Sequence, residues 1–136
     1  MKLRILKECT EIALKNNNPN SHPQWDHYKH YSFVIQDNTL IAWGTNKPGS
    51  PLTFLGYKPY QKIHSETVAY FKAAKRMDKN RSFEVINIRL SKTNTFKPSA
   101  PCKCCCNFLR NLGCVRIWFS MTNGMFCSLN ANNLSP

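Results

Sequence analysis

Three residues have the types and the spacing of a metal site. Cys102 and Cys105 stand three positions apart behind Pro101, and His64 opens a different predicted helix. Two cysteines with this spacing at a helix start can face one metal, and the partial positive charge of that terminus favours the thiolates that bind zinc. One imidazole brings the protein ligands to three and leaves a fourth position for water, as a catalytic zinc site requires. The sequence therefore predicts a Zn²⁺ site formed by His64, Cys102 and Cys105.

Glu66 stands two positions after His64 and is the predicted proton carrier. Zinc lowers the pKa of its water toward neutrality and generates hydroxide, which can attack a ring carbon that bears an amine. A carboxylate beside that water can take its proton and deliver protons to the ring nitrogen and the departing amine. Taken alone, a CxxC also fits a redox pair or half of a structural zinc site, and an HxE also fits a helix-start histidine with a surface glutamate. Together, in this order and at two predicted helix starts, they indicate an enzyme.

The segment from about Tyr31 to Leu129 resembles the cytidine deaminase superfamily. The resemblance rests on His64-Ser65-Glu66 and on Pro101-Cys102-Lys103-Cys104-Cys105, which match its HxE and PCxxC motifs. That superfamily includes cytidine and deoxycytidylate deaminases, tRNA adenosine deaminases, APOBEC-type polynucleotide deaminases and bacterial deaminase toxins. The resemblance implies a zinc-dependent hydrolase that replaces the exocyclic amine of a nucleobase with oxygen, with Glu66 as the catalytic residue.

Three further residues are candidate substrate contacts on the same resemblance. Gly44-Thr45-Asn46 resembles the segment in which such enzymes place an asparagine near the nucleotide sugar, although Asn46 could equally be a buried asparagine that caps a turn. Ser65 stands where an alanine is usual, which spares the backbone amide that contacts the base and alters the polarity of the pocket. Ser99-Ala100-Pro101-Cys102 resembles a serine-containing approach to the zinc helix in several polynucleotide deaminases, so Ser99 is the third candidate.

Hydrophobic spacing and turn residues predict the elements that position these side chains. Helices are expected at residues 2–15, 65–77 and 102–112, and strands at 31–35, 39–44, 85–90, 115–120 and 125–129. Gly113 closes the third helix, Asn123-Gly124 turns the last two strands into an antiparallel hairpin, and prolines and glycines make 45–62 a long loop. The order indicates one α/β domain over residues 1–136, a five-stranded mixed sheet between helices in the three-layer α/β/α arrangement of the cytidine deaminase fold.

The cysteines do not indicate a disulfide scaffold. Four of the seven crowd into residues 102–106, where neighbouring thiols cannot join distant parts of the chain. The cysteines outside the metal site are expected to pack, beside the metal helix at Cys104 and Cys106 and in the core at Cys9, Cys114 and Cys127. The N-terminus has no continuous apolar stretch, so neither a signal peptide nor a membrane span is predicted. We therefore expect an intracellular, cytoplasmic protein in a reducing compartment.

The charge balance is strongly basic. The chain has 19 Lys and Arg against 7 Asp and Glu, a formal net charge of +12. A field of that sign attracts phosphate backbones and free nucleotides alike, although it could also serve solubility alone. Trp25, Tyr57 and Tyr60 lie near basic residues in stretches expected to flank the pocket, where rings can stack bases and cations can neutralise phosphates. The alternative is that these rings anchor the core or the loops.

These features favour a cytosine deaminase that acts on nucleic acid, with single-stranded DNA favoured over RNA and duplex DNA. The rival is a free cytidine or deoxycytidylate (dCMP) deaminase. It fits the small size of the chain and the predicted terminal hairpin, an arrangement that within the superfamily resembles free-nucleoside enzymes and deaminase toxins. A third interpretation is a non-catalytic nucleic-acid-binding domain with a structural zinc. The zinc motif alone does not exclude an adenine or guanine substrate, because the same hydrolytic machinery serves both ring types.

Overall fold

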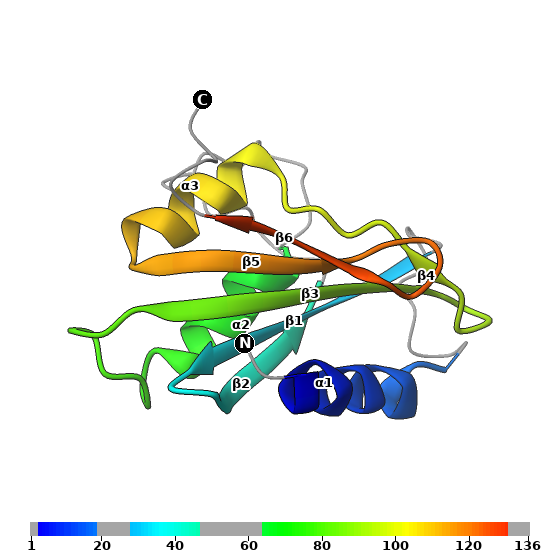
Figure 1. Cartoon of the computed structure of the whole chain (residues 1–136), viewed down its shortest axis with the longest axis horizontal. Coiled ribbons are helices and arrows are strands. Elements are labelled where there is room, and N and C mark those ends of the chain that lie inside the picture. The colour runs from blue at the N-terminus through cyan, green and yellow to red at the C-terminus, as the bar shows by residue number, and fades with distance from the viewer. Residues whose placement is uncertain (1–2, 19–27, 47–63, 131–136) are drawn as a thin grey trace.

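The computed structural model describes residues 3–18, 28–46 and 64–130, which form a mixed sheet with helices on both faces (Figure 1). In chain order the elements are α1 (Leu3–Asn16), β1 (Tyr28–Gln36), β2 (Thr39–Thr45), α2 (Ser65–Ala73), β3 (Phe83–Ser91), β4 (Phe96–Lys97), α3 (Lys103–Asn111), β5 (Cys114–Ser120) and β6 (Phe126–Asn130). The strands lie in the order β2-β1-β3-β5-β6, and β4 pairs with β3 beside that path. β3 and β5 run parallel, whereas β5 and β6 form an antiparallel hairpin. The predicted α/β fold with a five-stranded mixed sheet is confirmed.

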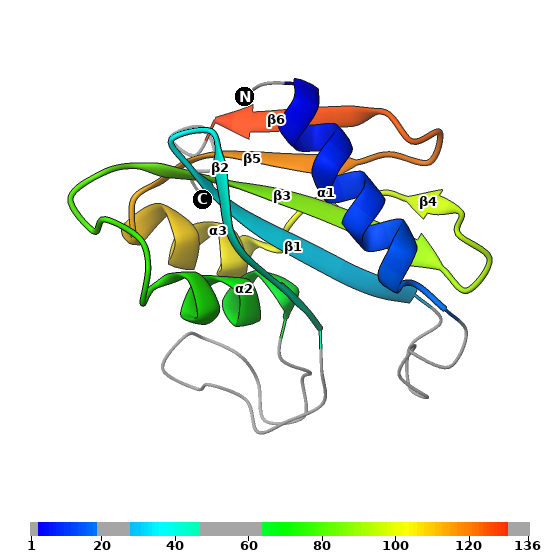
Figure 2. The ribbon, with the colours of Figure 1, turned by 90° about the horizontal axis from the view of Figure 1, so that it is seen from below.

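The two faces of the sheet are covered by different helices (Figure 2). On one face, α1 packs on apolar side chains of β1 and β3, namely Tyr31, Phe33, Ile35, Ile86, Ile88 and Leu90. On the other, residues of α2 and α3 pack on Val34, Val85 and Ile117. Because successive strand side chains point to opposite faces, odd positions of β1 and even positions of β3 face α1. The remaining positions face the layer of α2 and α3.

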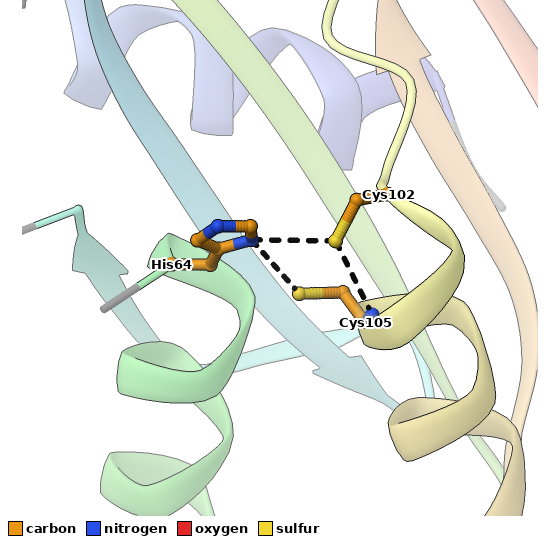
Figure 3. A group of neighbouring side chains, drawn as sticks. All are labelled: His64, Cys102 and Cys105. Atoms are coloured by element: carbon orange, nitrogen blue, oxygen red, sulfur yellow. Dashed lines mark hydrogen bonds between the residues drawn. The ribbon is translucent and has the colours of Figure 1, made fainter. Parts of the chain in front are cut away.

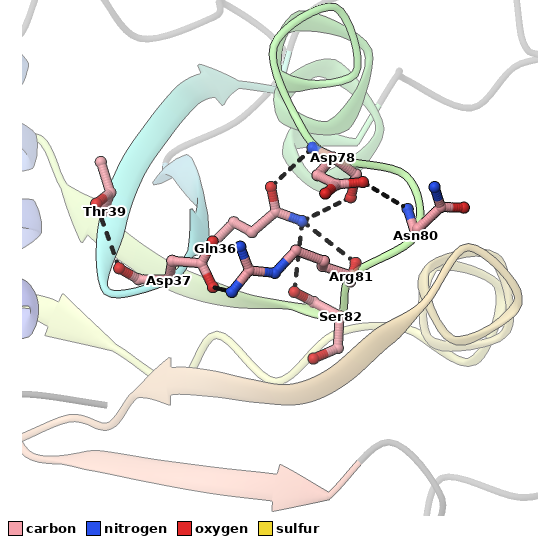
Figure 4. A network of polar contacts seen from close by, with 7 residues as sticks. All are labelled: Gln36, Asp37, Thr39, Asp78, Asn80, Arg81 and Ser82. Atoms are coloured by element: carbon pink, nitrogen blue, oxygen red, sulfur yellow. Dashed lines mark hydrogen bonds and ion pairs between the residues drawn. The ribbon is translucent and has the colours of Figure 1, made fainter.

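Helix α2 ends four residues before the predicted end at residue 77, and this part of the prediction is wrong. The reason is a contact distant in sequence: Gln36, at the end of β1, accepts a hydrogen bond from the Asp78 amide at 2.9 Å and donates to the Asp78 carbonyl at 2.8 Å (Figure 4). An ion pair of 2.7 Å between Arg81 and Asp37 holds the same turn. These bonds direct the chain away from the helix and into β3.

Strand β4 is the second difference, because residues 93–101 are predicted as a plain connection. Its two residues pair with Arg89 and Leu90 near the end of β3. The other helices and strands overlap their predicted ranges, and the hairpin turns at Gly124 with a φ of +79°, as its Asn-Gly sequence predicts. Within the described ranges, every helix is too short or too polar for a transmembrane span.

Gly44 allows α2 to lie directly against β2. A Cβ at this position would come within 2.6 Å of Val68 Cγ1 and 2.9 Å of the Ala69 backbone nitrogen. Those separations are far shorter than the roughly 3.5–4.0 Å at which packed carbon atoms attract. The absence of a side chain at Gly44 therefore allows α2, whose N-terminus carries His64 and Glu66, to pack closely against β2.

Candidate active site

His64 and Cys102 each stand at the N-terminus of a helix, as the sequence predicts, at the N-cap position. His64 is the N-cap of α2, and its side chain makes no capping hydrogen bond. Cys102 is the N-cap of α3, and its sulfur accepts a hydrogen bond from the Cys105 amide at 3.4 Å. Because a helix N-terminus carries partial positive charge, both helices favour an anionic thiolate at this point.

The two helix starts bring one nitrogen and two sulfur atoms together (Figure 3). His64 Nδ1 lies 3.3 Å from Cys105 Sγ and 3.4 Å from Cys102 Sγ, and the ligand atoms of all three residues lie within 4.8 Å of one another. Zinc bonds of about 2.3 Å to sulfur and about 2.0 Å to nitrogen would place a tetrahedral N···S pair about 3.5 Å apart. The donor set and its spacing therefore fit a zinc ion with three protein ligands.

The thiol of Cys102 differs chemically from its buried neighbour Cys106. Hydrogen bonds from Cys105 and His64 lower the pKa of Cys102 to about 4, so this sulfur is a thiolate at neutral pH. Burial raises the pKa of Cys106 to about 11, and this residue packs in the core against α2 and the sheet. The predicted division of the cysteine run into metal ligands and a packing thiol is consistent with this difference.

The remaining cysteines agree with prediction except at one position. Cys9 and Cys114 are buried, and Cys104 is partly buried. The prediction for Cys127 is wrong, because this residue is exposed. It lies on the edge strand β6, and its neighbour Phe126 is the residue that packs against the α1 core. Strand alternation therefore turns Cys127 to the opposite face.

A cavity of about 240 Å³ opens beside the group of His64, Cys102 and Cys105, called the metal cluster below. It is lined by His30, Asn46, His64, Ser65, Glu66, Arg89, Ser99, Ala100 and Cys102. The three predicted substrate contacts in the described part of the chain thus reach one cavity together with two of the predicted metal ligands and the predicted proton carrier. Trp25, Tyr57 and Tyr60 lie outside the described residues.

Glu66 is buried at the cavity wall, with 7% of its surface exposed. Burial is the main cause that raises the pKa of its carboxyl, since a low-dielectric site disfavours the charged form. Ser65 Oγ donates to Oε1 at 3.3 Å, and Asn87 Nδ2 donates to Oε2 at 3.2 Å. Both carboxylate oxygens are therefore held by the protein in the cavity that His64 and Cys102 also line.

Asn87 is the centre of a buried network behind that carboxylate. Ser32 Oγ donates to Asn87 Oδ1 at 2.7 Å and lies 2.7 Å from Ser65 Oγ. Ser99 Oγ donates to the Asn87 carbonyl at 2.9 Å, and the Asn87 side-chain amide approaches the Ser99 carbonyl at 3.4 Å. Buried polar groups that are bonded in this way adopt one geometry. The network therefore orients Glu66 and joins it to the segment that leads into α3.

Asn46 is buried and bonds across to strand β1, and the segment in which it could cap a turn lies outside the described residues. Its Oδ1 accepts a hydrogen bond from the His30 amide at 3.0 Å, and its own amide donates to the His30 carbonyl at 3.3 Å. Because the residue also lines the cavity, these bonds to His30 position it there. The structural role and a substrate contact are thus compatible at this position.

Ser32, Asn87 and Arg89 are site residues that the sequence analysis missed. For Asn87 and Arg89 the signal is the alternation in Val85–Leu90, where the apolar Ile86, Ile88 and Leu90 alternate with Val85, Asn87 and Arg89. For Ser32 it is a polar residue between Tyr31 and Phe33. Because alternate residues of a strand share a face, a polar set within an otherwise apolar strand indicates a site. From Ile86 to Leu90 the face that α1 covers is apolar.

Solved structures of deaminases match nearly the whole chain. A cytidine deaminase from Burkholderia pseudomallei gives a TM-score of 0.63 at 18% identity, over 100% of this chain and 98% of that one. The apo dCMP deaminase of cyanophage S-TIM5 gives 0.56 at 19% identity over 92% and 90%, and a cytidine deaminase from Mycobacterium leprae gives 0.57 at 14% identity over 96% of each chain. No family model and no curated protein matches the sequence. The chain therefore has a cytidine deaminase-like fold, and that fold holds a His/Cys/Cys cluster suited to zinc.

Proposed function

We propose that this protein is a zinc-dependent hydrolytic deaminase that converts cytosine to uracil. The observation that carries the proposal is one cavity lined both by His64 and Cys102 of the metal cluster and by the buried carboxylate of Glu66. Zinc held by His64, Cys102 and Cys105 would supply Lewis-acid activation of the attacking water. The cytidine deaminase-like fold supports the same chemistry.

Glu66 is the proposed proton carrier. Because burial raises the pKa of its carboxyl, this group can both accept and hold a proton closer to neutral pH than an exposed glutamate can. In the proposed reaction it takes one proton from the attacking water and gives it to the ring nitrogen, and it then takes the remaining proton of the added hydroxyl and delivers it to the departing amine. One water is consumed, the carbon–nitrogen bond to the exocyclic amine breaks, ammonia leaves, and a carbonyl oxygen replaces it. Ser65 and Asn87 hold the carboxylate in position during these steps.

The proposed substrate contacts come from three different segments of the cavity wall. Asn46 follows β2, Ser65 begins α2, and Ser99 precedes α3. We assign Asn46 to the sugar side of the substrate, and Ser65 to the base through its backbone amide. The Ser99 hydroxyl donates to the Asn87 carbonyl at 2.9 Å and accepts from the Ser120 amide at 2.8 Å. Ser99 therefore positions the wall against which the base is proposed to lie.

Cytosine in single-stranded DNA is the first proposed substrate. The net charge of +12 supports it, since neutralising phosphates is the dominant electrostatic term in binding nucleic acid. A single strand also presents its bases without the cost of unpairing a duplex. Stacking of bases on Trp25, Tyr57 and Tyr60 belongs to this proposal and concerns residues outside the described ranges.

A free nucleotide or nucleoside, dCMP or cytidine, is the second candidate. The observation that favours it is the antiparallel β5–β6 hairpin, an arrangement that resembles free-nucleoside enzymes. The solved structures that share this fold include cytidine and dCMP deaminases.

The decisive experiment is to incubate the zinc-loaded protein with cytidine, dCMP, single-stranded DNA, duplex DNA and RNA, and to identify the products by mass. Replacement of an amine by oxygen in the single strand, at a higher kcat/KM than in dCMP, supports the first candidate. Turnover of free nucleotides alone supports the second. Zinc-loaded protein that binds nucleic acid but changes the mass of none of these substrates contradicts the enzyme proposal and favours a non-catalytic binding domain.

A further inference from the structure

Arg89 carries a charge into the cavity for which the deamination chemistry above has no use. It lies on β3 two positions beyond Asn87, on the same face, and it lines the cavity. In the antiparallel ladder between β1 and β3, Ser32 pairs with Asn87 and His30 pairs with Arg89. Since a strand rises about 3.3 Å per residue, Arg89 stands about 7 Å along the cavity wall from the level that holds Glu66.

The contacts of Arg89 position its guanidinium without neutralising it. The guanidinium carbon lies 4.3 Å from the centre of the Tyr28 ring, and Nη1 donates to the Pro98 carbonyl at 3.4 Å. Among the described residues, no carboxylate forms an ion pair with Arg89, and its buried Nε has no hydrogen-bond partner. Buried donors are normally paired, so this nitrogen calls for a water, an ion or a ligand as its partner.

We propose that Arg89 binds a phosphate oxygen of the substrate, so that the cavity selects phosphorylated cytosine nucleotides over the nucleoside. This inference rests on the proposed function and names the substrate class of the same site. Asn46, which we assign to the sugar side, bonds to His30, and His30 pairs with Arg89. A base whose amine lies beside Glu66 and whose sugar lies at Asn46 would therefore extend toward the wall that Arg89 and His30 form. The sugar and its phosphate follow the base in that direction.

A phosphate fits this arginine better than a neutral acceptor does. The guanidinium presents parallel N–H groups in a planar fork that matches two phosphate oxygens, and its charge complements an anion. The contact with the Tyr28 ring holds the guanidinium near that ring and leaves the charge in place, because a ring attracts a cation without removing its formal charge. The phosphate could belong to a free nucleotide or to the backbone of a strand, and the two sources share the same chemistry.

The test measures binding in a zinc-loaded Glu66→Gln background, so that turnover does not consume the ligand. Arg89→Gln removes the charge and the fork, whereas Arg89→Lys keeps the charge without the fork. The matched control is Arg116→Gln, because Arg116 also lies over a ring, that of Trp118, at 5.8 Å, and bonds Ser128 Oγ at 2.9 Å, but it stands on β5 away from the cavity lining.

The two members of each ligand pair differ in their phosphate charge. The pairs are deoxycytidine with dCMP, and a cytosine-centred trinucleotide with the same trinucleotide carrying neutral methylphosphonate linkages. We expect Arg89→Gln to weaken the charged member of at least one pair about tenfold or more, as loss of a charge-assisted hydrogen bond does. The neutral member should bind equally well to the parent and to Arg89→Gln. The affinity of Arg89→Lys for the charged member should lie between those of the parent and Arg89→Gln. Arg116→Gln should match the parent. Loss with dCMP identifies a free nucleotide phosphate, and loss confined to the trinucleotide identifies a backbone phosphate.

Equal weakening of charged and neutral ligands by Arg89→Gln would overturn the inference, as would the same loss in Arg116→Gln. A parent protein that does not distinguish either pair would overturn it too. Product analysis of the protein with Glu66 intact is a separate readout. If no substrate changes mass while dCMP binding still depends on Arg89, the deaminase proposal fails and the phosphate site stands. If uracil forms but phosphate has no effect on binding, the phosphate site fails and the deaminase proposal stands.

Discussion

The two faces of the sheet differ in the polarity of their side chains, although the same strands form both. Under α1, β1 and β3 contribute an apolar set that is fully or almost fully buried, including Phe33, Ile86 and Ile88. On the face toward α2 and α3, the same strands change along their length from the apolar Val34 and Val85 to polar residues at the cavity. The face toward α1 forms part of the core, whereas the face toward α2 and α3 forms core at one end and lines the cavity at the other.

The difference shows what a buried polar site requires. A polar group taken out of water without a partner costs a few kcal/mol, so the site face can hold Ser32, Asn87 and Glu66 only because they bond one another. The apolar side chains of Phe33, Ile86 and Ile88 on the α1 face have no such requirement, since dispersion and the hydrophobic effect need no directional partner. Substitutions on the site face should therefore change chemistry first, whereas those on the α1 face should change stability first.

The largest expected difference is in zinc affinity, between substitutions of two neighbouring cysteines, Cys105 and Cys106. Cys105→Ser removes one of three metal ligands and should lower zinc affinity more than about 100-fold, because even residues that only orient ligands contribute 10–100-fold. Deaminase activity should disappear with the metal. Cys106→Ser, one residue further on α3 and packed in the core, should retain zinc. Metal content after dialysis against a chelator measures both, and equal zinc loss in the two variants would contradict the assigned ligand set.

Glu66→Gln should remove activity and leave the metal. General acid–base catalysis contributes about 10²–10⁴-fold, and we expect kcat/KM to fall in that range while zinc content is unchanged. Glu11→Gln, on the exposed side of α1, loses the same charge away from the site and is the matched control. Full activity in Glu66→Gln would exclude the carboxylate as the proton carrier.

Asn87 and Ile88 are neighbours in sequence that face opposite sides of the sheet. Substituting each one therefore tests whether the cavity face governs chemistry and the α1 face governs stability. Ile88→Ala should lower the free energy of unfolding by about 2–5 kcal/mol, the usual cost of a core cavity. Its kcat per folded molecule should stay near the parent value. Asn87→Ala releases Glu66 Oε2 and should lower kcat about tenfold or more, with a smaller loss of stability of about 1–3 kcal/mol. Denaturant unfolding and steady-state kinetics measure the two effects, and a reversed order would contradict the division between the faces.

The smallest expected effect is on thiol reactivity in metal-free protein. The pKa of Cys102 is lowered to about 4, so at pH 6 the group is above its pKa and is a reactive thiolate. Cys106, with a pKa raised to about 11, is far below its pKa at pH 6 and stays protonated. Brief treatment with iodoacetamide at pH 6 should label Cys102 and spare Cys106, and labelling should fall as the pH approaches 4. Peptide mass mapping reads the sites, zinc should protect Cys102, and preferential labelling of Cys106 would contradict the prediction.

The local features of this protein were predictable because local residues cause them. Pro101 and the cysteine spacing predict the start of α3, Gly113 its end, and Asn123-Gly124 the last hairpin. The end of α2 was not predictable, because Gln36 from a distant strand turns the chain at Asp78. β4 was missed for the same reason, since pairing with Arg89 and Leu90 defines it.

The sequence by itself determined the donor atoms of the metal cluster and the carboxylate beside them, because motif spacing at two helix starts is a local property. Only the tertiary structure decided that Asn87 holds that carboxylate and that the Arg89 guanidinium lies over the Tyr28 ring. These contacts depend on the register between β1 and β3, which pairs Ser32 with Asn87 and His30 with Arg89. A slip of one residue would turn the apolar set under α1 toward the opposite face, so burial of that set selects the register and thereby assembles the site on the other side.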